Sequence, residues 1–179
     1  LKSGSKDTIT ANCKDCGAEG GSVTITAPAE DTLTYNGKAK PATLVLTDWR
    51  GTNVNDSAIT YRYNDHPGVM SPYHGVPTDA GKYTASIKLG EATASVDYTI
   101  KKAPLTVTAK DTTITYGDML TGNGVQYEGL VSGDESKLGT LSYTSSYKLY
   151  GDVGDNYTIT PKGLRSDNYE ITPVSGKLT

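Results

Sequence analysis

The chain has 179 residues, a hydrophobic share of 35%, and a net charge of −3 from 17 basic and 20 acidic residues. This balance excludes a broad basic surface for nucleic acid, and no polybasic run, bilayer-spanning segment or signal peptide is present. The length fits one large or two small domains. Phe is absent while Tyr occurs 13 times, so tyrosine rings must supply most of the buried aromatic surface.

The first predicted element is an N-terminal β-hairpin within residues 1–26. Two alternating runs, residues 8–11 and 22–26, flank a Gly-rich turn that contains Cys13 and Cys16. Two strands around a Gly-rich turn favour a hairpin. This segment is part of the first module or leads into it.

Further alternating runs predict the strands of a first module over residues 27–102. They cover residues 43–46, 59–63, 83–89 and 92–100, and each should have one buried and one exposed face. The pair Asn36-Gly37 is a strong turn signal. Prolines and glycines interrupt the pattern over residues 64–78, which predicts one long exposed loop.

A second module, over residues 103–179, begins after a boundary near 101–104. Pro104 lacks an N–H and therefore marks a strand start or an edge strand. Strands are predicted at residues 105–108, 113–116, 125–127, 141–143, 157–160, 169–172 and 176–179. Residues 133–138 can make at most one helical turn, so the fold class is all-β.

One short pattern organises both modules. Asp79, Gly81 and Tyr83 form a D-x-G-x-Y step before a strand, and Gly154 and Tyr157 repeat it with one extra residue. Such a step predicts a tyrosine corner, in which the Tyr hydroxyl bonds back to the main chain and the Gly takes the sharp turn. Two copies predict two tandem small β-sandwich modules, Ig-like by preference, with a β-grasp-like sheet as the alternative.

The second module resembles the MBG-type (YGX-type) repeat of bacterial surface proteins. The resemblance runs across residues 103–179 and is carried by APLTVTAKD (103–111), YGD (116–118), YEGLVSGD (127–134), GTLSY (139–143) and NYEI (168–171). Residues 27–102 resemble more loosely the Ig-like repeats of Gram-positive surface proteins, through LTYNGKAKP (33–41) and DAGKY (79–83).

These resemblances imply a large secreted or wall-attached protein in which the modules recur as spacers or adhesive units. They imply an extracellular location, neighbouring modules of a longer chain as partners, and no catalytic residues, so no enzyme activity is expected. Because the chain opens on Leu1 rather than Met, we expect it to be a piece of a longer polypeptide. The leading hypothesis is a spacer. The alternative is an adhesin unit that binds host glycan or mucin, without nucleic-acid binding or membrane insertion.

If the fragment binds a ligand, two regions are the candidates. The 64–78 loop contains His66, Tyr73 and His74, and long loops on rigid scaffolds often carry binding residues. Trp49 beside Arg50 can stack on a sugar face, or it can pack against the end of a sheet. The histidines can also be solvated loop residues without a role.

Cys13 and Cys16 are spaced as half of a zinc knuckle, but a structural zinc site needs four ligands. A local disulfide that stiffens the hairpin turn is the preferred interpretation for an exported protein. Two free thiols, or pairing with partners outside the chain, are alternatives.

Acidic turns at 117–118, 133–135 and 152–155 provide oxygen donors for calcium but are also ordinary turn chemistry. A Lys–Asn or Lys–Asp isopeptide crosslink is a further alternative, although no pattern singles out a pair. No nucleophile, zinc-protease or P-loop motif occurs. We therefore expect no metal, no cofactor and no catalytic residue.

Overall fold

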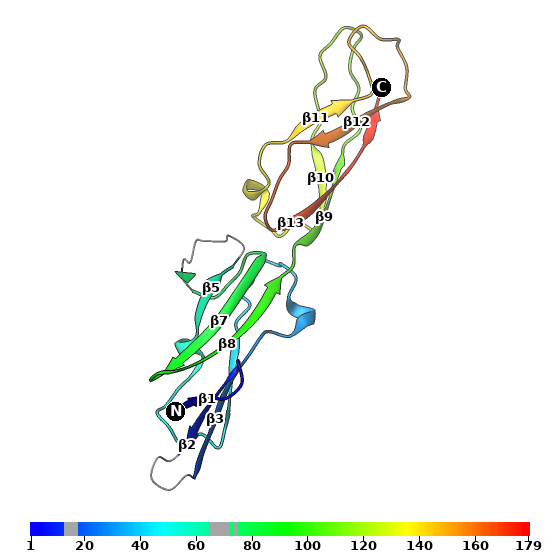
Figure 1. Cartoon of the computed structure of the whole chain (residues 1–179). Coiled ribbons are helices and arrows are strands. Elements are labelled where there is room, and N and C mark those ends of the chain that lie inside the picture. The colour runs from blue at the N-terminus through cyan, green and yellow to red at the C-terminus, as the bar shows by residue number, and fades with distance from the viewer. Residues whose placement is uncertain (13–17, 65–71, 74) are drawn as a thin grey trace. The chain divides into compact units, whose positions relative to one another are not determined.

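The computed structural model describes residues 1–12, 18–64, 72–73 and 75–179, and every structural statement below concerns these residues. Clustering of contacts divides the chain into two compact units, Leu1–Lys101 and Lys102–Thr179. The fold is all-β, as predicted (Figure 1). Its helical elements are three short 3₁₀ turns, η1 (Glu30–Thr32), η2 (Asp56–Ala58) and η3 (Glu135–Lys137), and no helix of the described part is long and apolar enough to cross a membrane.

Four antiparallel strands form the first sheet of the N-terminal unit, in the order β1-β2-β3-β4. They are β1 (Lys2–Ser3), β2 (Thr8–Asn12), β3 (Glu19–Thr26) and β4 (Thr43–Thr47). β2 and β3 pair with each other and are the two arms of the predicted N-terminal hairpin. One expectation fails at β4, which has no buried face: Val45 and Leu46 point to opposite sides of the strand, and both are exposed.

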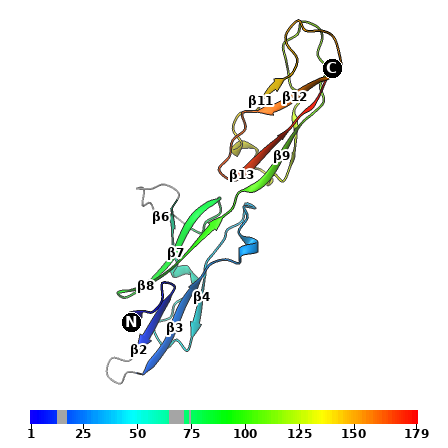
Figure 2. The same cartoon turned by 45° about the vertical axis from the view of Figure 1, so that its right-hand side comes forward.

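The second sheet of this unit is also antiparallel, in the order β6-β5-β7-β8. Figure 2 labels three of its strands, β6, β7 and β8. Its strands are β5 (Thr60–Tyr63), β6 (Pro72–Tyr73), β7 (Gly81–Leu89) and β8 (Ala92–Ile100). β7 and β8 form a long hairpin that turns at Gly90, whose φ of 59° suits a residue without a side chain.

The core of the N-terminal unit lies between its two sheets, where β2 and β3 pack against β8. Tyr83 is 1% exposed and packs between two other rings, with centroid distances of 5.3 Å to Tyr63 and 5.9 Å to Tyr98. Tyrosine therefore fills the aromatic core, as the composition predicts. Alternate positions on the two sheets bury the aliphatic side chains of Ile9, Val23, Ile25, Ala85 and Ile87.

The C-terminal unit also contains two sheets, with the strand orders β10-β9-β13 and β11-β12-β14. The strands are β9 (Ala103–Ala109), β10 (Val125–Glu128), β11 (Ser142–Ser145), β12 (Tyr157–Lys162), β13 (Tyr169–Val174) and β14 (Gly176–Leu178). β13 pairs in parallel with β9 from Tyr169 opposite Ala103 to Val174 opposite Thr108, whereas the other strand pairs are antiparallel. The strand that opens this unit and one of the two that close it are thus direct neighbours.

The core of the C-terminal unit is small. One cluster consists of Ala109, Ile159 and Leu178, which are almost fully buried and on which Tyr143 and Tyr147 pack. Leu105, Val107, Leu138 and Tyr169 are also buried. β12 contacts both β9 and β13, which brings the two sheets face to face.

The prediction of a strand over residues 113–116 is wrong. The bridge to β14 is made by the preceding residue, Thr112, which lies opposite Leu178. Within the segment, the Ile114 N–H donates to the Thr179 carbonyl oxygen at 2.8 Å. The chain then turns at Gly117, whose φ is 86°. The alternating sequence pattern predicted a strand because it does not show how far main-chain pairing extends. Here the pairing is limited to the end of β14, and the chain then turns away.

The prediction that residues 64–78 form one exposed loop is also wrong in part. β6 lies within this range and pairs with β5, and Pro77 is fully buried. The Pro77 carbonyl oxygen accepts a hydrogen bond of 2.8 Å from the Lys40 N–H. The far end of the loop is therefore tied to the body of the unit.

Candidate functional site

Trp49 and Arg50 lie in the segment that follows β4. Trp49 is half-buried, and its indole N–H donates to the Thr52 carbonyl oxygen at 3.0 Å. The ring lies against Gly51, where an added Cβ would come within 2.4 Å of a ring carbon. The side chain of Arg50 is exposed, while its main-chain N–H donates to the Gly20 carbonyl oxygen at 3.1 Å. These contacts hold the indole within its own loop.

The other candidate ligand-binding residues are only partly described. His66 and His74 lie outside the described residues, as do Cys13 and Cys16, so the interpretations of these four side chains remain predictions. Tyr73 belongs to β6, and its backbone lies opposite Tyr61 of β5.

The tyrosine corner of the N-terminal unit is formed by main-chain and side-chain atoms together. The Tyr83 hydroxyl donates to the Asp79 carbonyl oxygen at 3.0 Å, so this bond uses the main chain of Asp79 rather than its carboxylate. Gly81 has a φ of 152°, outside the range that other residues adopt easily. The sharp turn and the back-reaching hydroxyl thus occur together.

The C-terminal unit has a looser version of this corner. The Tyr157 hydroxyl donates to the Asp152 carbonyl oxygen at 2.9 Å, five residues back instead of four. Gly154 is not among the glycines with positive φ, and an added Cβ would make only an ordinary contact of 3.8 Å with the Tyr157 ring. The expectation that Gly154 takes the sharp turn is therefore wrong, because the extra residue relaxes it.

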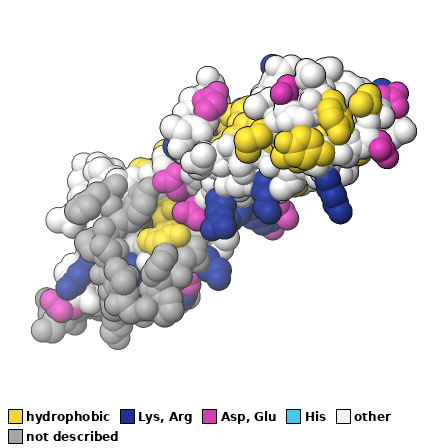
Figure 3. All heavy atoms as spheres, turned by 90° about the horizontal axis from the view of Figure 1, so that it is seen from above, with side chains coloured by type: hydrophobic (Ala, Val, Ile, Leu, Met, Phe, Trp, Pro, Cys, Tyr) yellow, Lys and Arg dark blue, Asp and Glu magenta, His cyan; other side chains and the backbone are white. Residues whose placement is uncertain are grey.

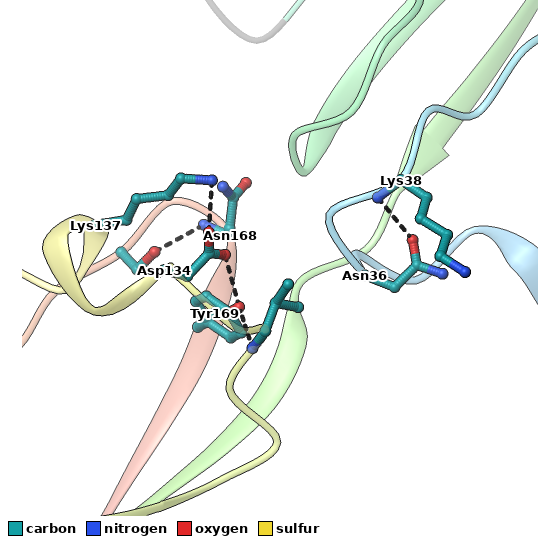
Figure 4. A network of polar contacts seen from close by, with 8 residues as sticks. Asn36, Lys38, Asp134, Lys137, Asn168 and Tyr169 are labelled. Carbon is teal, nitrogen blue, oxygen red and sulfur yellow. Dashed lines mark hydrogen bonds and ion pairs between the residues drawn. The ribbon is translucent and has the colours of Figure 1, made fainter.

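A buried polar network lies in the C-terminal unit where the loop around η3 meets the start of β13 (Figure 4). Asp134 is 5% exposed, and its carboxylate accepts from the Tyr169 hydroxyl at 2.8 Å and pairs with the Lys137 ammonium group at 2.7 Å. The Tyr169 hydroxyl in turn accepts a bond of 3.0 Å from the Val131 N–H. Asn168 is buried beside this network. The network fixes the loop around η3 to the first residue of β13.

The acidic turns proposed as calcium ligands do not converge. Among the described residues, no group of three or more His, Cys, Asp or Glu side chains could hold a metal ion. Asp134 of the second turn is engaged with Tyr169 and Lys137, and Asp155 of the third pairs with Lys177 at 3.4 Å.

Asn36, in the predicted Asn-Gly turn, accepts from the Lys38 N–H at 3.1 Å through its side-chain oxygen (Figure 4).

Sequence reasoning missed one feature of the C-terminal unit, a group of exposed hydrophobic side chains in its connecting segments. Figure 3 shows hydrophobic side chains gathered at the surface of this unit. Tyr116 and Tyr150 are 61% and 69% exposed, and Val153 is also exposed. The sequence contains one indication that Tyr116 lies in a connecting segment: Gly117, which follows it, is a turn-forming residue and argues against a strand there.

Comparison with known families decides the nature of the C-terminal unit. Residues 105–179 match the MBG domain (YGX type). The resemblance is confirmed. The MBG match lies within the second compact unit, and MBG domains are typical of bacterial surface proteins. No curated protein and no solved structure matches the chain. The looser resemblance of residues 27–102 to Ig-like repeats remains a prediction.

Proposed function

We propose that the two units are non-catalytic repeat modules that act as a spacer in a bacterial cell-surface or secreted protein. The observation that carries this proposal is the MBG match, which covers almost all of one compact unit. The unit has its own core and its own tyrosine corner. Such a module can be repeated along a chain without a partner to complete its fold.

The strand arrangement of the C-terminal unit supports a role under tension. A spacer transmits force between its ends, so force enters before β9 and leaves after β14. Because β9 and β13 are parallel neighbours, this force slides one strand along the other. All hydrogen bonds between the strands then resist together, whereas strands peeled from one end lose their bonds one after another.

Single-molecule stretching of the full chain tests this proposal. Handles at the two termini load β9 against β13 in shear. For comparison, handles at Lys102→Cys and Asp167→Cys peel the same strands apart, because the Ala103 N–H donates to the Asn168 carbonyl oxygen at 2.9 Å. Both substituted side chains are exposed, and a Cys13→Ser, Cys16→Ser background leaves only the new thiols.

We expect a clearly higher unfolding force for the C-terminal unit with terminal handles than with peeling handles. The released chain length, roughly 3.3–3.6 Å per residue, identifies which unit has opened. Equal unfolding forces in the two geometries would contradict a spacer adapted to tension.

The competing proposal is an adhesin unit that binds host glycan or mucin through residues 64–78 and Trp49. Its test is binding of the full chain to a glycan and mucin panel, with Trp49→Ala as the variant. The contacts of the Trp49 indole with Gly51 and Thr52 favour the spacer, because a stacking ring needs a free face. If the parent chain binds a glycan or mucin specifically and Trp49→Ala abolishes that binding, the adhesin proposal would be favoured over the spacer proposal.

A further inference from the structure

The chain contains two Asn-Gly pairs, Asn36-Gly37 and Asn123-Gly124, and the structure gives them different surroundings. An asparagine loses its side-chain amide most readily before glycine, because glycine has no side chain to shield its main-chain nitrogen from the carboxamide carbon. Asn36 and Gly37 are both exposed, and so are the two residues that follow them. This turn is therefore open to water along its whole length.

The Asn36 carboxamide lies toward the peptide that follows it. Its oxygen accepts a hydrogen bond of 3.1 Å from the Lys38 N–H, which holds the side chain on the side of Gly37 (Figure 4). A donor on this oxygen stabilises the negative charge that develops there when a nucleophile adds to the carbon. Among the described residues, neither the amide nitrogen of Asn36 nor the N–H of Gly37 has a hydrogen-bond partner. The leaving group and the nucleophile are thus both free.

The second pair is tied to the sheet of the C-terminal unit. The Asn123 amide nitrogen donates to the Asp111 carbonyl oxygen at 3.4 Å. Gly124 is half-buried, and its carbonyl oxygen accepts a bond of 3.0 Å from the Lys110 N–H. A reaction between these two residues requires the carboxamide to leave Asp111 and the Gly124 peptide to turn, and both bonds resist that movement. The same dipeptide is therefore restrained in one unit and free in the other.

We propose that Asn36 is a site of spontaneous deamidation in the folded protein. The Gly37 nitrogen loses its proton to solvent and attacks the side-chain carbon of Asn36, which closes a succinimide ring. The displaced amide takes up a proton and leaves as ammonia. Water then opens the ring at either carbonyl carbon and yields aspartate or isoaspartate at this position. Water is the only co-reactant, and the inference does not depend on the spacer proposal.

The isoaspartate product should loosen the N-terminal unit, because the turn lies between two buried anchors. Tyr35 is 3% exposed, and its N–H donates to the Lys101 carbonyl oxygen at 2.9 Å. Lys40 is 5% exposed, its N–H donates to the Pro77 carbonyl oxygen at 2.8 Å, and its own carbonyl oxygen accepts from the Tyr98 hydroxyl at 2.9 Å. An isoaspartate lengthens the main chain between these anchors by one carbon atom, whereas an aspartate changes only the charge.

Peptide mapping by mass spectrometry of the full chain, aged at mildly alkaline pH, measures both pairs in one sample. Deamidation changes the mass of a peptide, and chromatography separates its isoaspartyl form from its aspartyl form. We expect Asn36 to react roughly fivefold faster than Asn123, because the need to break one further hydrogen bond slows the second pair by about that factor. The rate at Asn36 should rise with pH, since the Gly37 nitrogen attacks without its proton.

Guanidinium chloride separates the effect of the fold from that of the local sequence. Both pairs are free in the unfolded chain, so their rates should become similar. Asn36→Gln should stop the reaction in the first turn, because the longer side chain would have to close a larger ring, and Asn123→Gln is the matched control. The proposal is overturned if Asn36 reacts no faster than Asn123 in the folded chain, or if it keeps the same advantage in guanidinium chloride.

Thermal unfolding of the aged Asn123→Gln chain tests the structural consequence. Its isoaspartyl form, separated by chromatography, should melt at a lower temperature than the unaged chain. The variant that combines Asn123→Gln with Asn36→Asp carries the charge without the longer main chain and should melt as the unaged chain does. Equal melting temperatures for the isoaspartyl form and this variant would overturn the loosening of the N-terminal unit.

Discussion

The Tyr83 hydroxyl donates a hydrogen bond to the Asp79 carbonyl oxygen, four residues back along the chain, at 3.0 Å. The ring beneath that hydroxyl contacts the rings of Tyr63 and Tyr98. One side chain therefore closes a turn at the surface and fills the core of the N-terminal unit. In the C-terminal unit, Tyr157 closes the turn in the same way, but its ring is only half-buried.

Tyr83→Phe keeps the ring in the core and removes only the hydrogen bond. We expect the free energy of unfolding of the N-terminal unit to fall by about 1 kcal/mol, the usual net contribution of one such bond. Urea denaturation followed by tyrosine fluorescence measures the change. Tyr157→Phe is the matched comparison and should cost less than Tyr83→Phe, since water can replace the more exposed bond. Equal costs would show that burial does not control the energy of the corner.

Tyr169→Phe should destabilise the C-terminal unit more strongly. The change leaves the buried Asp134 carboxylate and the Val131 N–H each without a partner that Tyr169 now provides. A buried group that loses its partner costs about 1–3 kcal/mol, so we expect a loss of about 2–3 kcal/mol. Urea denaturation measures it, and Tyr127→Phe, a more exposed tyrosine of the same unit, should be nearly neutral. A loss below about 0.5 kcal/mol for Tyr169→Phe would mean that water satisfies Asp134.

Gly21→Ala should disrupt the contact between β3 and the end of β4. An added Cβ would lie 2.3 Å from the Asp48 carbonyl carbon, and Gly21 has a φ of 86°. The backbone cannot yield easily on either side, so a loss of about 2–4 kcal/mol is expected. Gly75→Ala provides the control, because Gly75 has a similar φ of 92° but no atom within 4 Å of the Cβ position. The difference in melting temperature between the two variants measures the clash alone.

Asp97→Asn should flatten the acid dependence of stability. The Lys6 ammonium group, at 2.5 Å, and then the Thr84 hydroxyl lower the pKa of the Asp97 carboxyl in the folded state. The stability that follows from a lowered pKa is present above the unfolded value of about 3.9 and is lost as pH falls through the folded pKa. Because both side chains are largely exposed, the contribution should stay below about 1 kcal/mol.

Urea midpoints between pH 2 and pH 6 test this expectation. Asp7, whose pKa is lowered chiefly by the Ser5 hydroxyl, remains in both proteins and contributes equally. The difference between the parent chain and Asp97→Asn should appear above about pH 4 and vanish in stronger acid. A difference that stays constant down to pH 2 would exclude the ionised carboxylate as its source.

Sequence periodicity predicted the positions of most strands, but it predicted their pairing only where the two strands are adjacent in the chain. β7 and β8 were found nearly to their ends because both alternate around a single glycine turn. The neighbour of β9 was not predictable, because the parallel partner β13 lies some 65 residues further on and nothing local encodes a parallel pairing. The short strand β6 was missed for a related reason, since Pro72 resembles a loop residue.

The sequence does not predict which tyrosines of the chain are buried and which are exposed. Tyr83 is 1% exposed and Tyr150 is 69% exposed, although both follow short polar or glycine-containing turns. A tyrosine has an apolar ring and a polar hydroxyl, so its own chemistry permits either location. Only the three-dimensional arrangement separates core tyrosines from exposed ones.

The pairing of β9 with β13 also determines when the C-terminal unit can fold during synthesis. The β7–β8 hairpin can close as soon as Ile100 has been made, because its strands are adjacent in the chain. β9 has only β10 as a sheet neighbour until Tyr169 and the residues after it are available. A nascent chain that ends before Tyr169 therefore presents one unpaired side of β9, and contacts of such long sequence separation form slowly. We expect the N-terminal unit to complete its fold first and the C-terminal unit to close only with its last residues.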